Sequence, residues 1–268
     1  MGKVIVLTGA SRGIGVSIAE DLAKDGHVLV LAARDRAGLE KTAEKVRAAG
    51  GKAIVVPGDI AKAADQDALI AAAEAEGPID VLINNAGVEI AKAVANQSPA
   101  EIELQLLIDL HAPILLTRKL LPKMLDRKAG AVVMISSMSG KSPTPYNAIY
   151  AAAKHGINGF VKSLRLELEG SGVQVGVVCP SFVADAGMWA DTGVKAPAAM
   201  REVPLAKVTA GVRRVIAGEG EVLVTPGPVR PLLALSELFP SLSGPVMRAM
   251  GVVDVLKQRD AVVRGKEH

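Results

Sequence analysis

The chain has 268 residues, half of them hydrophobic, so it is long enough to bury a sizeable core in one large α/β domain. Its 31 basic and 28 acidic residues nearly balance at a net charge of +3, and only 2% of residues are aromatic, which argues against binding nucleic acid by charge or by base stacking. One cysteine, Cys179, excludes an internal disulfide, and no Cys/His cluster has metal-ligand spacing, so we expect no metal site.

The N-terminal segment indicates neither secretion nor membrane insertion. The apolar run at 3–7 is too short for a secretory signal, and Thr8-Gly9 follows it at once. No apolar stretch reaches the roughly 18 residues that suggest a membrane span. We therefore expect a cytoplasmic protein.

Short apolar runs alternate with helical segments through the first part of the chain. Runs rich in Val, Ile and Leu are typical of strands that are covered on both faces of a parallel sheet. The predicted strands are 3–7, 27–32, 52–56 and 79–83. The predicted helices between them are 13–25, 36–49 and 62–76.

The same alternation continues in the second part. A long helix is predicted at 99–127, with Ser98 as its N-cap and Pro99 in its first turn. We expect Pro113 and Pro122 to bend or divide this helix. The remaining predicted elements are strands 131–135, 173–178 and 221–224 and helices 146–170 and 204–217.

These elements predict a doubly wound Rossmann-type α/β fold, with seven parallel strands and helices on both faces of the sheet. We expect one domain at 1–225, which includes a substrate lid at about 181–203. A long connection of this kind in a compact domain is often a binding loop. Residues 226–268 then form a C-terminal extension.

A glycine-rich turn follows the first predicted strand and precedes the first helix. It reads Thr8-Gly9-Ala10-Ser11-Arg12-Gly13-Ile14-Gly15. One glycine allows a tight turn, one lets the backbone approach a pyrophosphate, and one lets helix and strand pack closely. The N–H groups at the start of the helix can then bind the phosphates.

Three further motifs stand in the same order as in a known family. Asn84-Asn85-Ala86-Gly87 ends the fourth strand, Ser137 ends the fifth, and Tyr150 and Lys154 form a Tyr-x-x-x-Lys motif on the following helix. Together with the glycine turn, these motifs over residues 3–225 resemble the short-chain dehydrogenase/reductase family. The resemblance implies hydride transfer between a nicotinamide dinucleotide and a carbonyl or alcohol.

Tyr150 and Lys154 are four residues apart and therefore share one helix face. A neighbouring ammonium favours the phenolate, so we expect Lys154 to lower the pKa of Tyr150 from its usual value of about 10. The resemblance implies that Tyr150 exchanges the proton, that Ser137 binds the substrate oxygen, and that Lys154 also holds the nicotinamide ribose.

The end of the second strand bears on the choice of cofactor. An acidic residue there binds the ribose 2′-hydroxyl of NAD, but this chain has Ala33 followed by Arg34. Arg34 and Arg12 could pair with a 2′-phosphate, which favours NADP(H) over NAD(H). The alternative is two solvated arginines, one of them bridged to Asp35.

The resemblance also implies contacts between the cofactor and further positions, among them Asp59, for which a plain helix cap is the competing interpretation. The predicted cofactor-binding residues are Thr8, Gly9, Ser11, Arg12, Gly13, Ile14, Gly15, Arg34, Asp59, Ile60, Asn85, Ala86, Gly87, Tyr150, Lys154, Pro180, Ser181, Val183 and Asp185.

Three positions depart from the family pattern. Asp109 stands where an asparagine usually supports a bend of the long helix, and it is the fourth predicted catalytic residue. An ionised carboxylate accepts hydrogen bonds but cannot donate them. Ser181 and Asp185 stand where the family often has glycine and threonine after the sixth strand.

The segment 181–203 contains Phe182, Met188 and Trp189, which favours a hydrophobic ketone or aldehyde as substrate. The extension could close the pocket, pack on a neighbouring subunit or touch a membrane surface. The membrane contact is not favoured, because Pro240 and Pro245 interrupt the helix and the extension has no dense basic face. The resemblance implies a homodimer or homotetramer built through the two long helices. A non-catalytic NADP(H)-binding sensor or scaffold is the alternative function, against which the intact Ser, Tyr and Lys motifs argue.

Overall fold

The computed structural model describes residues 2–184, 187–189, 193–197 and 201–265. Seven strands form one parallel sheet in the order β3-β2-β1-β4-β5-β6-β7. The strands are β1 (Val4–Thr8), β2 (Val28–Ala33), β3 (Lys52–Pro57), β4 (Ile79–Asn84), β5 (Gly130–Ile135), β6 (Val173–Pro180) and β7 (Glu221–Val224). This order confirms the doubly wound fold that the sequence predicts.

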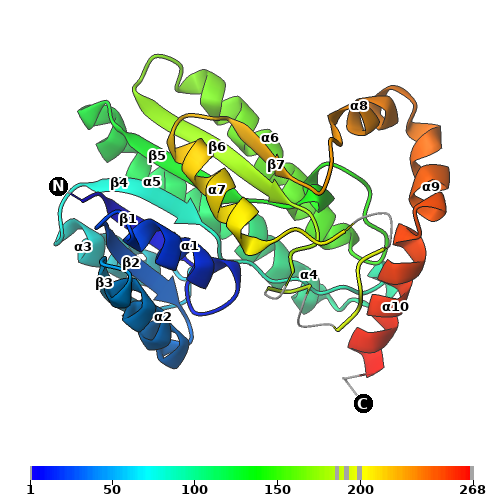
Figure 1. Ribbon diagram of the computed structural model, residues 1–268, viewed down its shortest axis with the longest axis horizontal. Coiled ribbons are helices and arrows are strands. Elements are labelled where there is room, and N and C mark those ends of the chain that lie inside the picture. Colours follow the sequence, from blue (N-terminus) through cyan, green and yellow to red (C-terminus); the bar gives the residue numbers. More distant parts are fainter. Residues whose placement is uncertain (1, 185–186, 190–192, 198–200, 266–268) are drawn as a thin grey trace.

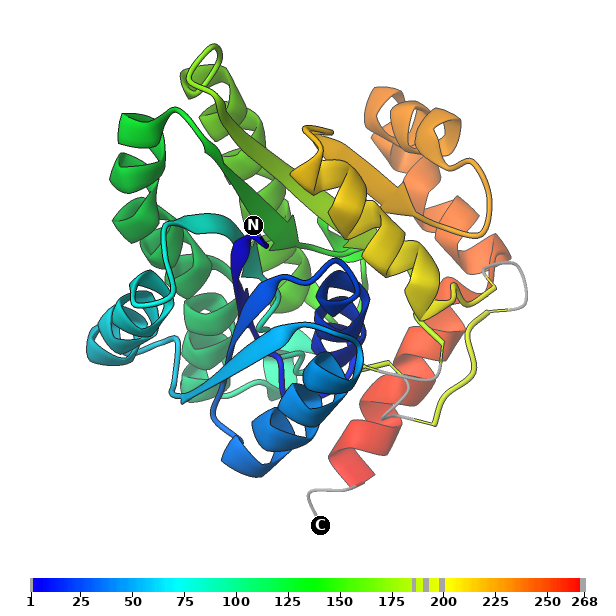
Figure 2. The same ribbon diagram turned by 60° about the vertical axis from the view of Figure 1, so that its left-hand side comes forward.

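Helices cover both faces of the sheet (Figures 1 and 2). One face packs against α1 (Ile14–Ala23), α2 (Arg36–Ala48) and α7 (Leu205–Ile216). The other packs against α3 (Ala63–Glu74), α5 (Ala112–Arg127) and α6 (Ala148–Glu167). The strand order reverses between β1 and β4, and in such sheets a crevice opens at the carboxyl ends of the strands at that point.

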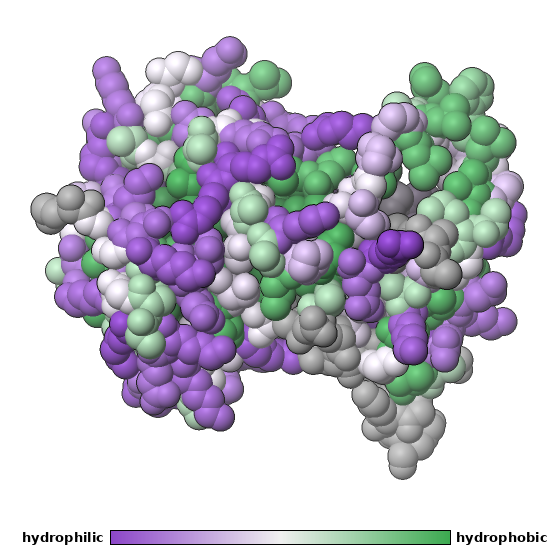
Figure 3. All heavy atoms as spheres, viewed as in Figure 1, coloured by the Kyte–Doolittle hydropathy of each residue, from purple (hydrophilic) through white to green (hydrophobic). Residues whose placement is uncertain are grey.

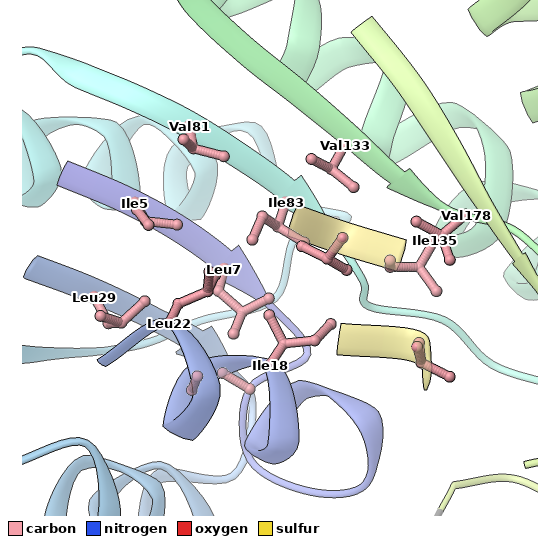
Figure 4. Close-up of a cluster of buried hydrophobic side chains, with 14 of the residues drawn as sticks. Ile5, Leu7, Ile18, Leu22, Leu29, Val81, Ile83, Val133, Ile135 and Val178 are labelled. Carbon is pink, nitrogen blue, oxygen red and sulfur yellow. The ribbon is translucent and has the colours of Figure 1, made fainter. Parts of the chain in front are cut away.

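Alternation along β1 shows how one strand serves both layers of the core. Ile5 and Leu7 face the layer that contains Ile18 of α1, as Figure 4 shows. Val4 and Val6 point to the opposite layer. Successive side chains of a strand point to opposite faces, so a strand buried on both sides must be apolar throughout.

The predicted helix 99–127 is divided in the structure. It consists of α4 (Pro99–Leu106), a π-helical turn (Leu107–His111) and α5. The backbone of Pro113 lacks an N–H group, and a wide turn just before it accommodates that loss. Pro122 does not divide the helix but lies within α5, so the division occurs only beside Pro113.

The cap predicted for this helix is present. Ser98 Oγ accepts a hydrogen bond from the backbone N–H of Glu101 at 3.3 Å, and the Glu101 side chain accepts one from the backbone N–H of Ser98 at 2.8 Å. This reciprocal capping box satisfies two donors that would otherwise be free at the helix start.

The chain continues after β7 as α8 (Arg230–Leu238), α9 (Pro240–Ala249) and α10 (Val252–Gly265). Large apolar side chains are exposed on the first two helices and between them, among them Leu238 and Phe239, and Figure 3 shows hydrophobic surface over this region. In contrast, α10 buries Val252 and Leu256 against Trp189. Within the described ranges, no helix has the length and apolar character needed to cross a membrane.

We predict that Leu7→Ala lowers the free energy of unfolding by about 2–5 kcal/mol, because it leaves a cavity between β1 and the helices that cover it. Urea denaturation measures this change. The control is Leu238→Ala, where the side chain is 74% exposed, and it should change stability by no more than about 0.5 kcal/mol. Equal losses in the two variants would contradict the assignment of Leu7 to the core.

Candidate active site

A cavity of about 570 Å³ lies at the carboxyl ends of the strands, where the sheet order reverses. Most of the residues predicted to form the site line it. They are Gly9, Ser11, Arg12, Gly13, Ile14, Arg34, Asp59, Ile60, Asn85, Ala86, Gly87, Ser137, Tyr150, Lys154, Pro180, Ser181 and Val183. Thr8, Gly15 and Asp109 lie behind this lining, and Asp185 lies outside the described residues.

The glycine turn has the conformation that its sequence predicts. Gly9 and Gly13 have φ values of 66° and 62°, in a region where side chains are strained. A Cβ on Gly15 would lie 2.2 Å from the carbonyl oxygen of Gly9. Gly15 therefore permits close packing of α1 on the turn and does not itself line the cavity.

Thr8 ties the end of β1 to the segment after β4. Its Oγ1 accepts hydrogen bonds from the backbone N–H groups of Asn85 and Ala86, both at 3.1 Å. In return, the Asn85 side-chain amide donates to the backbone oxygens of Thr8 and Gly9, both at 3.0 Å. These bonds position two motifs that are far apart in sequence at one edge of the cavity.

Arg12, Arg34 and Asp59 line the cavity, and the last two follow the neighbouring strands β2 and β3. Asp59 Oδ1 accepts a hydrogen bond from the backbone N–H of Ala61 at 3.0 Å. The N-cap of α3 is Lys62, so Asp59 stabilises the turn before the helix and is not its cap. Asp59 lines the cavity, and its contact with a cofactor stays a prediction.

Ser137, Tyr150 and Lys154 lie together on another wall. The Lys154 side chain is buried, and its Nζ lies 5.3 Å from the centre of the Tyr150 ring. The same Nζ donates a hydrogen bond to the carbonyl oxygen of Ile135 at 3.3 Å. Tight packing fixes this arrangement, since a Cβ on Gly140 would lie 2.6 Å from the Lys154 carbonyl oxygen. The short helical turn after Ser137 is thereby held against α6.

Asp109 lies in the π-helical turn, behind Lys154. Its Oδ1 is 3.5 Å from Lys154 Nζ and accepts a hydrogen bond from the backbone N–H of Val88 at 3.1 Å. Its Oδ2 is buried and has no hydrogen-bond partner among the described residues. Burial is the main cause that raises the pKa of Asp109 from 3.8 to about 6, although Lys154 acts in the opposite direction.

The expected lowering of the Tyr150 pKa is wrong for the structure as it stands. The pKa of Tyr150 is raised well above 10, first because the phenol is buried and then because the carboxylates Glu89 and Asp109 lie near it. A hydrogen bond with Ser137 and the charge of Arg259 lower it by less. Burial of the phenol, together with two carboxylates that the motif does not contain, therefore raises the pKa of Tyr150 instead of lowering it.

The sequence interpretation missed a polar cluster in the cavity wall. Glu89 accepts hydrogen bonds from Arg259 of α10, one of them 2.7 Å long, and from the side-chain amide of Asn147. All three residues line the cavity. The place of Glu89, two residues after the Asn-Asn-Ala-Gly motif, was a usable signal, whereas nothing in the sequence pointed to Arg259.

The predicted lid forms an apolar wall beside this cluster. The Phe182 and Trp189 rings are 4.4 Å apart between their centres, and Trp189 packs with Val252 and Leu256 of α10. Val183 and Val203 pair as a short parallel bridge at the base of the lid. The described residues Phe182, Met188 and Trp189 of this segment thus line the cavity together with residues of the extension.

The chain resembles proteins that are already described. The model of the short chain dehydrogenase family matches residues 3–196. The ketoacyl reductase HetN of Nostoc sp. is 41% identical over 265 residues, which cover 96% of this chain and 92% of that protein.

Two solved structures have a similar fold, and the match to this chain covers nearly the whole length of each. A variant of actinorhodin polyketide ketoreductase with NADPH has a TM-score of 0.78 and 31% identity, over 84% of this chain and 97% of that chain. A metagenomic short-chain oxidoreductase in complex with NADP has a TM-score of 0.73 and 34% identity, over 85% and 98% of the two chains.

We predict that Asp109→Asn raises stability at pH 8, by on the order of 2 kcal/mol, and changes it much less near pH 4. The pKa of the Asp109 carboxyl is about 6 in the folded protein and 3.8 in the unfolded chain, so the folded state binds this proton more tightly. Wild-type stability therefore falls as pH rises from about 4 to about 6, and the uncharged amide avoids that loss.

Urea denaturation at the two pH values measures this effect. Asp126→Asn, at an exposed position, is the control and should give the same small change at both. A loss of stability for Asp109→Asn at pH 8 would mean that the ion pair with Lys154 outweighs the burial of the charge.

Proposed function

The chain belongs to the short-chain dehydrogenase family of oxidoreductases, and we propose that it transfers a hydride between NADP(H) and the carbonyl or secondary alcohol group of a hydrophobic compound. The observation that carries this proposal is the placement of Ser137, Tyr150 and Lys154 in the same cavity as the glycine turn. A dinucleotide site and a proton-transfer group in one cavity are what such a reaction requires.

The residues present fit a dinucleotide. Gly9 and Gly13 leave a cradle that a side chain would fill, since a Cβ on Gly13 would lie 3.2 Å from the backbone of Gly187. The N-terminus of α1 presents backbone N–H groups to a pyrophosphate. Arg12 and Arg34 would bind a 2′-phosphate, and the two similar structures described above were solved with NADPH or NADP.

The bound cofactor supplies the hydride, and the chain's own residues handle the proton. Ser137 binds the substrate oxygen, Tyr150 donates its proton to that oxygen during reduction, and Lys154 holds the ribose beside them. Burial keeps the pKa of Tyr150 high, so the phenol is protonated at neutral pH. The protonated form is the one that reduction consumes, and the phenolate is the one that alcohol oxidation requires.

The lining beyond Tyr150 supports a hydrophobic substrate. Phe182, Met188 and Trp189 of the lid and Met247, Val252 and Leu256 of the extension line this part of the cavity together. Apolar side chains with a few fixed polar groups are typical of sites for small apolar ligands.

We also propose the organisation of the chain and its assembly. Residues 1–225 form the catalytic domain, and 226–268 form an extension that packs on it through α10. The predicted long helix 99–127, which comprises α4, the π-helical turn and α5, and the helix α6 form the subunit interface of a homo-oligomer, as the family resemblance implies. In the single chain, the large apolar side chain of Leu166 on α6 is 76% exposed, and such an interface would bury it.

We predict that Tyr150→Phe lowers NADPH-dependent carbonyl reduction by about 100-fold or more, because the proton donor is lost. Nicotinamide absorbance with a panel of long-chain, cyclic and aromatic ketones measures the rate, and fluorescence measures NADPH binding, which should persist. Tyr146→Phe is the matched control, since this second tyrosine packs in the lid cluster outside the cavity lining. Turnover that survives in Tyr150→Phe would show that Tyr150 is not the proton donor. NADPH binding without any turnover by the wild-type protein would favour the alternative function of a non-catalytic sensor.

We predict that Arg34→Ala raises the KM for NADPH by about tenfold and leaves the KM for NADH nearly unchanged, because only NADPH carries the 2′-phosphate. Steady-state kinetics with each cofactor measure this. Arg36→Ala is the control, because that exposed arginine pairs with Glu40 and does not line the cavity. Wild-type preference for NADH would overturn the choice of NADP(H).

A further inference from the structure

The C-terminal helix α10 brings two adjacent charged residues into the protein interior. Arg259 and Asp260 are 3% and 2% exposed. Asp260 Oδ1 accepts a hydrogen bond from the backbone N–H of Ala93 at 2.9 Å, which anchors the helix to the segment after β4. Arg259 lies one residue earlier and lines the cavity.

Arg259 makes its main contacts with a carboxylate and an aromatic ring. Its two terminal nitrogens donate to the two oxygens of Glu89, a bidentate geometry that fits a guanidinium and a carboxylate. The guanidinium carbon is 5.3 Å from the centre of the Trp189 ring, and Nη2 also donates to the carbonyl oxygen of Met188 at 3.4 Å. The lid, the segment after β4 and α10 therefore meet at this one side chain.

Glu89 is in turn joined to the helix that carries Tyr150. The side-chain amide of Asn147 donates to Glu89, and Asn147 is the N-cap residue of α6. Tyr150 is three residues further along. Glu89 is thus held beside the first turn of α6 by donors from two elements.

Four charged groups surround the Tyr150 phenol. They are Glu89 from the segment after β4, Asp109 from the π-helical turn, Lys154 from α6 and Arg259 from α10. Asp109 is paired with Lys154, and Glu89 is paired with Arg259. Each carboxylate thus has one cation beside it, and the loss of either cation leaves an uncompensated negative charge near the phenol.

We propose that Arg259 is a positioning residue that acts on Tyr150 through Glu89, so that the C-terminal extension sets the proton affinity of the proton donor. This inference rests on the proposed function. Nearby negative charge disfavours the phenolate, and charges act strongly on one another in a buried site. The directions agree with this assignment, since Glu89 raises the pKa of Tyr150 and Arg259 lowers it.

The test is the pH profile of alcohol oxidation with saturating NADP⁺, because that direction requires the phenolate and its rate rises with pH. In Arg259→Met the rising limb should move to higher pH by about one unit, since Glu89 is left unpaired. In Glu89→Gln it should move to lower pH by a similar amount. In the double variant Glu89→Gln/Arg259→Met it should return close to the wild-type position, because both charges are absent.

Two controls separate this effect from a loss of structure. Lys257→Met removes a positive charge from an exposed position on the same helix and should not move the limb. Asp260→Ala removes an anchor of α10 and should lower the melting temperature while leaving the limb in place. If Arg259→Met does not fold, the opposite shift in Glu89→Gln alone decides the question.

The outcomes are distinct. Wild-type turnover with limbs that stay in place in both single variants overturns this inference and leaves the proposed function intact. A limb that moves equally in Asp260→Ala assigns the effect to docking of the helix, which also overturns the inference. The absence of any wild-type turnover overturns the proposed function, and the inference with it.

Discussion

The contact between the ends of β1 and β4 is the constraint on which the rest of the site depends. Thr8 and Asn85 exchange hydrogen bonds there, and Gly9 and Gly15 let the backbone of the turn approach both α1 and Asn85. Because the strand order reverses at this point, the connections leave in opposite directions and open a cavity between them. This junction places the glycine turn at the edge of the cavity that Tyr150 also lines.

Buried charge is the second organising feature. The pairs Asp109–Lys154 and Glu89–Arg259 both lie near Tyr150, the first at the side of the π-helical turn and the second at the side of the extension. A buried carboxylate is costly unless it is paired, so each pair also ties together the elements that carry it. The electrostatics of the phenol therefore depend on the core of the fold and on a helix that follows its last strand.

Much of the architecture could be predicted because its physical signals are local. Apolar runs such as Val4–Leu7 mark strands that are buried on both faces, and the Ser98 cap marks the beginning of a helix. The placement of the long-helix break was only partly predictable. Pro113 signalled a disturbance, but the π-helical turn forms before it, whereas Pro122 is accommodated inside α5.

The candidate site divides in the same way. Ser137, Tyr150 and Lys154 could be recognised from the family resemblance, and the spacing of four residues places Tyr150 and Lys154 on one helix face. The direction of the Tyr150 pKa could not, because it depends on burial and on Glu89, which is 61 positions away in the printed sequence. Arg259 carried no signal at all, as an arginine in a C-terminal helix is usually a solvated residue.

The sequence by itself determined the order of strands and helices, the position of the glycine turn and the residue types that can exchange a proton. The order of elements follows from periodicity along the chain, which is independent of distant contacts, and the proton-exchanging residues follow from the family resemblance. Only the tertiary structure decided which charges surround Tyr150, because electrostatic effects depend on distance and burial in space. The packing of α10 against the lid brings Arg259 to Glu89, and no feature of the linear sequence contains that distance.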